Sequence, residues 1–263
     1  MTTLAPLLTL SQRRFRLTAH TPRELVVPLV TPILFALVIA PALKEALHTG
    51  GAYESFVAVG TVGLLIPLNT MFSGLGVIVD REHGVQRELL AAPVPRPFLV
   101  LGNLTVAVAV TAFQIVTLIV VAVARGIDFS AGGAGLVWFT AAAALLAVGM
   151  YGLAETLAGR VPRQEEYIAR VPAIAIVPWF LAGALFPITA LPAFLTWVAR
   201  FLPLTHGLGL MRYGLLGDAS GLRDIWGLSS DGAMAGLSLG ALVLFAAVLT
   251  AVSMRAFARS AVR

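Results

Sequence analysis

The sequence predicts an all-α membrane protein with six transmembrane helices, an N-terminal interfacial helix and a short re-entrant helical pair before the last span. Three observations carry this prediction. Charged residues make up only 12% of the 263 residues, about half of their share in a typical soluble protein. The mean hydropathy is +0.92. Six stretches of at least 19 residues contain no Asp, Glu, Lys or Arg, and each is long enough to cross about 30 Å of hydrocarbon as a helix.

An interfacial helix is expected first, over residues 7–20. Leu7, Leu10, Arg14 and Leu17 recur there at helical spacing beside a basic face, which is typical of a helix that lies on the cytoplasmic leaflet. A disordered tail is the alternative, but it would leave a phenylalanine and three leucines exposed to water.

Membrane spans are then expected at the six uncharged stretches. They lie near residues 25–43, 55–79, 98–124, 133–155, 171–186 and 233–254. The segment after the fifth span, residues 187–218, is apolar but interrupted by three prolines. We expect it to form two short helices that dip into the outer leaflet and return, with Trp197 and Tyr213 at the level of the headgroups. No repeat or linker divides the chain, so residues 1–263 are expected to form a single transmembrane domain.

Basic residues predict the orientation of the spans. Six crossings place both termini on one side, and the segments on that side hold 13 basic residues against 5 on the other. The positive-inside rule therefore predicts cytoplasmic N- and C-termini and a cytoplasmic loop over residues 80–97. Arg outnumbers Lys 17 to 1, which we interpret as the codon bias of a GC-rich bacterium, so the expected location is a bacterial plasma membrane. Nucleic acid is not an expected partner, because the basic residues recur in short clusters between apolar runs.

The loop over residues 80–97 holds six of the 31 charged residues. Val85, Leu89 and Ala92 would form an apolar stripe on a short helix over 81–92, and Pro93 would end that helix. The other faces carry charges of both signs, on Asp80, Arg81, Glu82, Arg87 and Glu88. This mixed surface favours docking of a second protein, and an ordinary solvated turn is the alternative.

The sequence contains no motif for metal binding, catalysis or phosphate binding. There is no cysteine, and the four histidines lie in separate segments, so no metal site and no catalytic residue is expected. A phosphate-binding loop needs a glycine directly before its lysine. The only lysine, Lys44, follows Leu43, so the chain is expected to bind no ATP by that loop and to be no enzyme.

Two polar groups in the spans are candidates for transport. Asn69 stands in the stretch P-L-N-T-M-F, where it could line a pathway for an apolar substrate, and interhelical hydrogen bonding is the alternative. Glu155 ends the fourth span and is the nearest candidate for a proton relay. We favour instead a carboxylate at the cytoplasmic end of the span, near Arg160.

The charged loop resembles that of a known family. The stretch D-R-E-H-G-V-Q-R-E-L-L-A-A-P-V-P-R is similar to the loop between spans two and three of ABC type 2 transporter permeases, and it departs from their pattern at Val85 and at Arg87–Glu88. The matching residues are Asp80, Arg81, Glu82, Gly84, Leu89, Leu90, Pro93 and Arg96. The segments that begin T-P-R-E-L-V-V-P and F-P-I-T-A-L-P are also similar to this family, above all to its daunorubicin-resistance type of drug exporter.

This resemblance implies an exporter made of two six-span permeases, identical or homologous, and two separate ATPase subunits that bind ATP and Mg. The helix over 81–92 would dock in a groove of the ATPase. Spans two and five would face the second permease, near Asn69, Phe72, Trp179 and Phe180. The substrate would be an amphipathic drug, natural product or lipid, with multidrug efflux and antibiotic resistance as the expected role. A glycan or glycolipid exporter is the alternative within the family, and a membrane-embedded enzyme or scaffold outside it.

Overall fold

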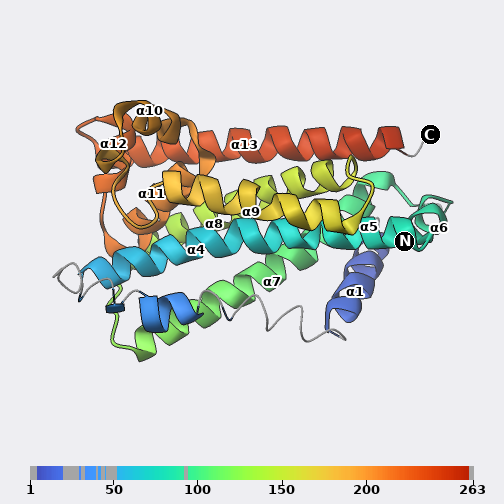
Figure 1. Ribbon diagram of the computed structural model, residues 1–263, viewed down its shortest axis with the longest axis horizontal. Coiled ribbons are helices and arrows are strands. Elements are labelled where there is room, and N and C mark those ends of the chain that lie inside the picture. The colour runs from blue at the N-terminus through green and yellow to red at the C-terminus, as the bar shows by residue number, and fades with distance from the viewer. Residues whose placement is uncertain are drawn as a thin grey trace.

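The computed structural model describes residues 5–19, 30, 33–39, 41–42, 45, 52–91 and 94–260. Every regular element in these ranges is a helix, which confirms the predicted all-α class. The long helices lie side by side along the longest axis of the molecule (Figure 1). Of the predicted first span, residues 25–43, the structure describes residues 30, 33–39 and 41–42, which are helical and include η1 (Phe35–Ile39). The rest of this span lies outside the described residues.

Four helical runs are long and apolar enough to cross a bilayer in the part of the chain that the structure describes. They are α4 with α5 (Ala52–Ser73 and Leu75–Glu82), α7 (Arg96–Ala124), α8 (Gly133–Ala158) and α13 (Asp231–Ser260). These runs correspond to the predicted second, third, fourth and sixth spans. The second extends beyond residue 79 because α5 continues α4 after a single turn residue, Gly74.

The predicted fifth span, residues 171–186, corresponds to α9 (Gln164–Leu181), whose boundaries differ from the prediction. The helix begins before the uncharged stretch, with Glu165 and Glu166 in its first turn, and it is not among the four long apolar runs. It ends at Leu181 because Gly183, just beyond it, has a φ of 81°, a left-handed conformation that commonly follows a helix.

The segment between α9 and α13 forms more short helices than the two that were predicted. They are η2 (Ile188–Ala190), α10 (Ala193–Phe201), α11 (Pro203–Leu216) and α12 (Ser220–Trp226). Pro192 and Pro203 stand before α10 and at the first position of α11, where a missing backbone N–H does no harm. α11 is buried against α4, α8 and α13, whereas α10 exposes Trp197 and Tyr213 of α11 is half-buried.

The two ends of the molecule are built from different elements. α10 and α12 lie at one end, and α1 (Ala5–Ala19), α5, α6 (Val85–Ala91) and the last turns of α13 lie at the other (Figure 1). The segments that the basic residues predict to be cytoplasmic are therefore gathered at one end of the helix bundle.

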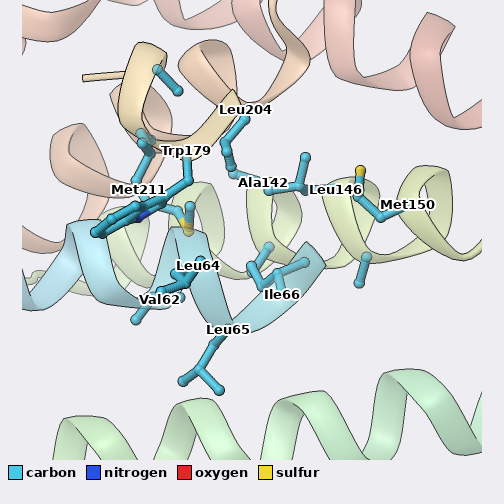
Figure 2. Close-up of a cluster of buried hydrophobic side chains, with 14 of the residues drawn as sticks. Val62, Leu64, Leu65, Ile66, Ala142, Leu146, Met150, Trp179, Leu204 and Met211 are labelled. Carbon is cyan, nitrogen blue, oxygen red and sulfur yellow. The ribbon is translucent and has the colours of Figure 1, made fainter. Parts of the chain in front are cut away.

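The core forms where α4, α8, α9 and α11 meet (Figure 2). Its labelled side chains are Val62, Leu64, Leu65, Ile66, Ala142, Leu146, Met150, Trp179, Leu204 and Met211. Glycines let the backbones approach closely. A Cβ on Gly60 would lie 2.2 Å from the carbonyl oxygen of Ala184, and one on Gly152 would lie 2.8 Å from the carbonyl carbon of Leu249. Such close packing holds helices together in lipid, where no hydrophobic force acts between them.

Candidate coupling surface

We call residues 80–91 the coupling surface. It comprises the last residues of α5, a turn at His83 and Gly84, and α6. The sequence predicts a single short helix over 81–92, but the structure divides it. Gly84 has a φ of 76°, which glycine adopts without steric cost, and this turn separates α5 from α6.

Two charged residues of the coupling surface join it to separate helices. Asp80 forms ion pairs with Arg13 and Arg14 of α1, at N–O distances of 3.4 and 3.7 Å. Glu82 accepts a hydrogen bond of 2.5 Å from the side-chain amide of Gln164, the first residue of α9. Both contacts bridge residues far apart in the sequence, so the coupling surface is tied to α1 and to α9.

Arg81, which stands between these two residues, binds the end of α8. Its guanidinium donates hydrogen bonds to the carbonyl oxygens of Ala158 (3.0 Å), Val161 (2.5 Å) and Pro162 (3.2 Å). The last carbonyls of a helix have no partner within it, and a cation there also interacts favourably with the helix dipole. Arg81 therefore fixes the coupling surface to the connection between α8 and α9.

The face of the coupling surface that points away from the chain is charged. Its exposed side chains include Glu82, His83, Arg87 and Glu88. Leu89 instead lines a cavity of about 20 Å³, together with side chains of α5, α7, α8 and α13. The predicted apolar stripe is thus turned partly towards its own chain. Ala92 and Pro93, also predicted to take part in coupling, lie outside the described residues.

Asn69, a predicted pathway residue, lies between two helices of the chain. Its side-chain amide donates a hydrogen bond to the side-chain oxygen, Oε1, of Gln114 on α7. Asn69 is 9% exposed and Gln114 is fully buried. This is the interhelical hydrogen bond that stood as the alternative role of Asn69.

The other three predicted pathway residues point in different directions. Trp179 is buried, and its indole N–H donates to the carbonyl oxygen of Gly60 over 2.7 Å, which joins α9 to α4. Phe72 of α4 and Phe180 of α9 are exposed. Within one chain, the structure therefore places two of the four predicted residues inside the bundle and two on its outer surface.

Tyr167 is a contact residue that sequence patterns did not identify. Its hydroxyl donates to the carbonyl oxygen of Met71 over 2.6 Å and lies 3.4 Å from that of Ala154. Met71 shortly precedes the break between α4 and α5, and a Cβ on Gly74 would lie 2.3 Å from the Tyr167 hydroxyl. Nothing in the spacing of a lone tyrosine near the start of a helix signals such a contact.

Glu155 is buried at the end of α8, where it interacts with partners other than the expected Arg160. The hydroxyl of Tyr151, one turn earlier, donates a hydrogen bond to its carboxylate. The positive charge of Arg14 on α1 also acts on both groups. Arg160 is exposed.

The end of the molecule that carries the coupling surface is held together by ion pairs and hydrogen bonds of charged side chains. Carboxylates and guanidinium groups connect the coupling surface to α1, α8 and α9, and further charges are left on its outer face. Among the described residues, no group of three or more His, Cys, Asp or Glu is placed to hold a metal ion. Such a surface is suited to binding a charged partner and to transmitting its movement.

Comparison with known proteins gives consistent matches. The ABC-2 type transporter family matches residues 6–216. The transport permease ycf38 of Porphyra purpurea is 24% identical over 211 residues, which cover 78% of this chain and 72% of the relative. The ycf38 permease of Pyropia yezoensis is 25% identical over 199 residues, or 73% of this chain and 67% of the relative. Nodulation protein J of Rhizobium leguminosarum bv. trifolii is 29% identical over 175 residues, or 64% of each chain.

Proposed function

This chain is a membrane permease subunit that belongs to the ABC-2 type transporter family, and we propose that its complex exports an amphipathic drug, natural product or lipid from the cytoplasm. Permeases of this family have no ATPase activity of their own, so nucleotide is bound and hydrolysed by a separate ATPase subunit. The transport permeases among its relatives agree with this assignment.

The observation that carries the proposal is the triplet Asp80, Arg81 and Glu82. These three consecutive residues contact α1, the end of α8 and the start of α9, respectively. A force on the coupling surface is therefore passed directly to three separate parts of the bundle. This is the property that a permease requires if a separate subunit supplies the energy for transport.

The docking partner is the ATPase, which binds the outer face of the coupling surface. The exposed charges there, Arg87 and Glu88 among them, offer both signs to a complementary groove. The positive-inside distribution of basic residues supports a cytoplasmic location for this end, together with α1 and the last turns of α13. The complex contains two ATPase subunits and a second permease, identical or homologous, in a bacterial plasma membrane.

The second permease binds against α4 and α9. Phe72 and Phe180 are large apolar side chains on the outer surface of these two helices. Asn69 and Trp179 stand on the same helices but face inward, so they would shape the interface from behind rather than touch the partner.

Reconstitution tests the proposed function. The tagged permease is purified from its native membranes, and the co-purifying ATPase is identified and reconstituted with it in vesicles. We expect ATP-dependent transport of daunorubicin or of a fluorescent phospholipid analogue. Failure of any ATPase to co-purify would contradict the coupling role. Transport of a labelled glycolipid, with no transport of the other two probes, would instead support the glycan or glycolipid alternative.

A further inference from the structure

We propose that Arg14 of α1 is a positioning residue that makes the interfacial helix move together with the coupling surface. The inference rests on the proposed function, because it assumes that an ATPase displaces this surface. The Arg14 side chain lies against α5, and three observations define its role.

The first observation is a notch on α5 that the Arg14 side chain fills. A Cβ on Gly76 would lie 1.2 Å from Nη2 of Arg14 and 2.1 Å from its Cζ. No side chain fits at position 76 while the guanidinium is in place. Gly76 thus leaves the space in which a side chain of α1 can lie directly against the backbone of α5.

The second observation is that Arg14 forms an ion pair with a carboxylate of the coupling surface. Its Nη1 lies 3.7 Å from Oδ2 of Asp80 on the coupling surface, and both side chains are mostly buried, with 17% and 14% exposed. Its charge also acts on Glu155 of α8, which is 4% exposed. Separating a largely buried ion pair is costly, so Arg14 and Asp80 are expected to stay together when one of them moves.

The third observation is that α1 is held to the bundle on one side and open on the other. Leu10 lies against Gly102 of α7, where a Cβ would be 3.0 Å from that of Leu10. Leu8 and Phe15 are about 61% and 55% exposed, as expected of side chains that reach into the inner leaflet. A displacement of the coupling surface would therefore be transmitted through Arg14 to a helix that lies in the membrane surface.

Arg13 provides a matched comparison on the same helix. It also pairs with Asp80, at 3.4 Å, but its side chain is 34% exposed, twice the value for Arg14. An ion pair contributes less to stability as its charges become more accessible to solvent. Removal of Arg13 should therefore leave the connection between α1 and the coupling surface in place.

The test follows α1 in the complete complex with its ATPase. The chain has no cysteine, so Gln12→Cys on the exposed side of α1 provides a single labelling site. Its rate of reaction with a maleimide is measured in nanodiscs with and without ATP and vanadate. We expect trapping by ATP and vanadate to change the labelling rate at least threefold in the parent protein and in the Arg13→Gln variant. The labelling rate should stay unchanged in the Arg14→Gln variant.

Gly76→Ala provides an independent variant on a different helix. Its methyl group displaces the guanidinium, which is the mobile end of a flexible side chain, so the variant should fold and reproduce the effect of Arg14→Gln. Permease-dependent ATP hydrolysis should fall about fivefold in each single variant and no further in the double variant, because both disrupt one contact. Gly236→Ala, at a helical glycine with open space around it, should match the parent.

The outcomes separate this inference from the proposed function. If no ATPase co-purifies with the parent protein, the proposed function fails. If the ATPase binds but trapping leaves the labelling rate at position 12 unchanged in the parent, the role of Arg14 is refuted. It is also refuted if trapping changes this rate as much in the Arg14→Gln and Gly76→Ala variants as in the parent. Should Arg14→Gln not accumulate in the membrane, the Gly76→Ala result decides.

Discussion

Arg81 joins the coupling surface to the end of α8 and the residues that follow it through three hydrogen bonds. Arg81→Ala removes three hydrogen bonds from a charged donor and leaves the carbonyl oxygens at the end of α8 without this partner. Since charge-assisted hydrogen bonds contribute about 1.5–3 kcal/mol, we expect a loss of roughly that size in stability. Thermal unfolding in detergent measures it. Arg87→Ala, at an exposed position of the same surface, is the control, and equal midpoints for the two variants would contradict the assignment.

The hydrogen bond between Asn69 and Gln114 distinguishes a structural from a transport role for Asn69. Asn69→Leu removes one hydrogen bond from the buried Gln114 side chain, and we expect it to cost about 0.6–1.7 kcal/mol. The double variant Asn69→Leu, Gln114→Leu removes both polar groups and should recover most of this loss. Thermal unfolding of the two single variants and of the double variant compares their stabilities. A variant of normal stability that no longer transports would instead place Asn69 in the pathway.

At the scale of elements, the break between α4 and α5 depends on α9. Gly74→Ala would place a methyl group 2.3 Å from the hydroxyl oxygen of Tyr167, so we expect it to destabilise the protein by roughly 1–3 kcal/mol. Tyr167→Phe removes that oxygen and one hydrogen bond to Met71, at a cost of about 1 kcal/mol. Gly74→Ala should therefore do less harm in the Tyr167→Phe background. Additive losses in unfolding experiments would show that the two residues do not interact.

The second prediction at this scale concerns the two sides of α6. Glu88→Arg changes an exposed charge, so it should leave the stability of the permease unchanged and weaken ATPase binding by about 1 kcal/mol, or roughly fivefold. Leu89→Asp places a charge against α5, α7, α8 and α13 of its own chain and should lower the stability of the permease itself. Co-purification of the ATPase and thermal unfolding separate the two effects. An apolar docking contact at Leu89 would produce the reverse pattern.

At the scale of the whole molecule, cysteine labelling can test which end of the helix bundle faces the cytoplasm. The chain contains no cysteine, and His83 and Ser220 are exposed at opposite ends of the bundle. We expect an impermeant maleimide to label Ser220→Cys in intact cells and to label His83→Cys only after the cells are opened. Labelling of both in intact cells would overturn the orientation that the basic residues predict.

The sequence by itself determined the class of the protein and the position of its charged segment after the second span. Uncharged runs longer than a bilayer's thickness and clusters of arginine are local properties, so composition and order along the chain are enough to read them. The same applies to the charged stretch after the second span, and to the missing glycine before Lys44, which rules out a phosphate-binding loop of that pattern. Hydropathy could not set the limits of α9, since the uncharged run of 29 residues begins inside that helix and continues into the segment beyond it.

Only the tertiary structure decided which residues meet. Arg14 with Gly76, Arg81 with the end of α8, and Tyr167 with Met71 join positions far apart in the chain. Such contacts depend on how each helix is rotated about its axis and where it crosses its neighbours. A rotation of about 100° separates consecutive residues of a helix, so an apolar pattern alone leaves open which neighbour a side chain faces. That is why Leu89 lies against its own chain and why a glycine on α5 provides the space for an arginine of α1.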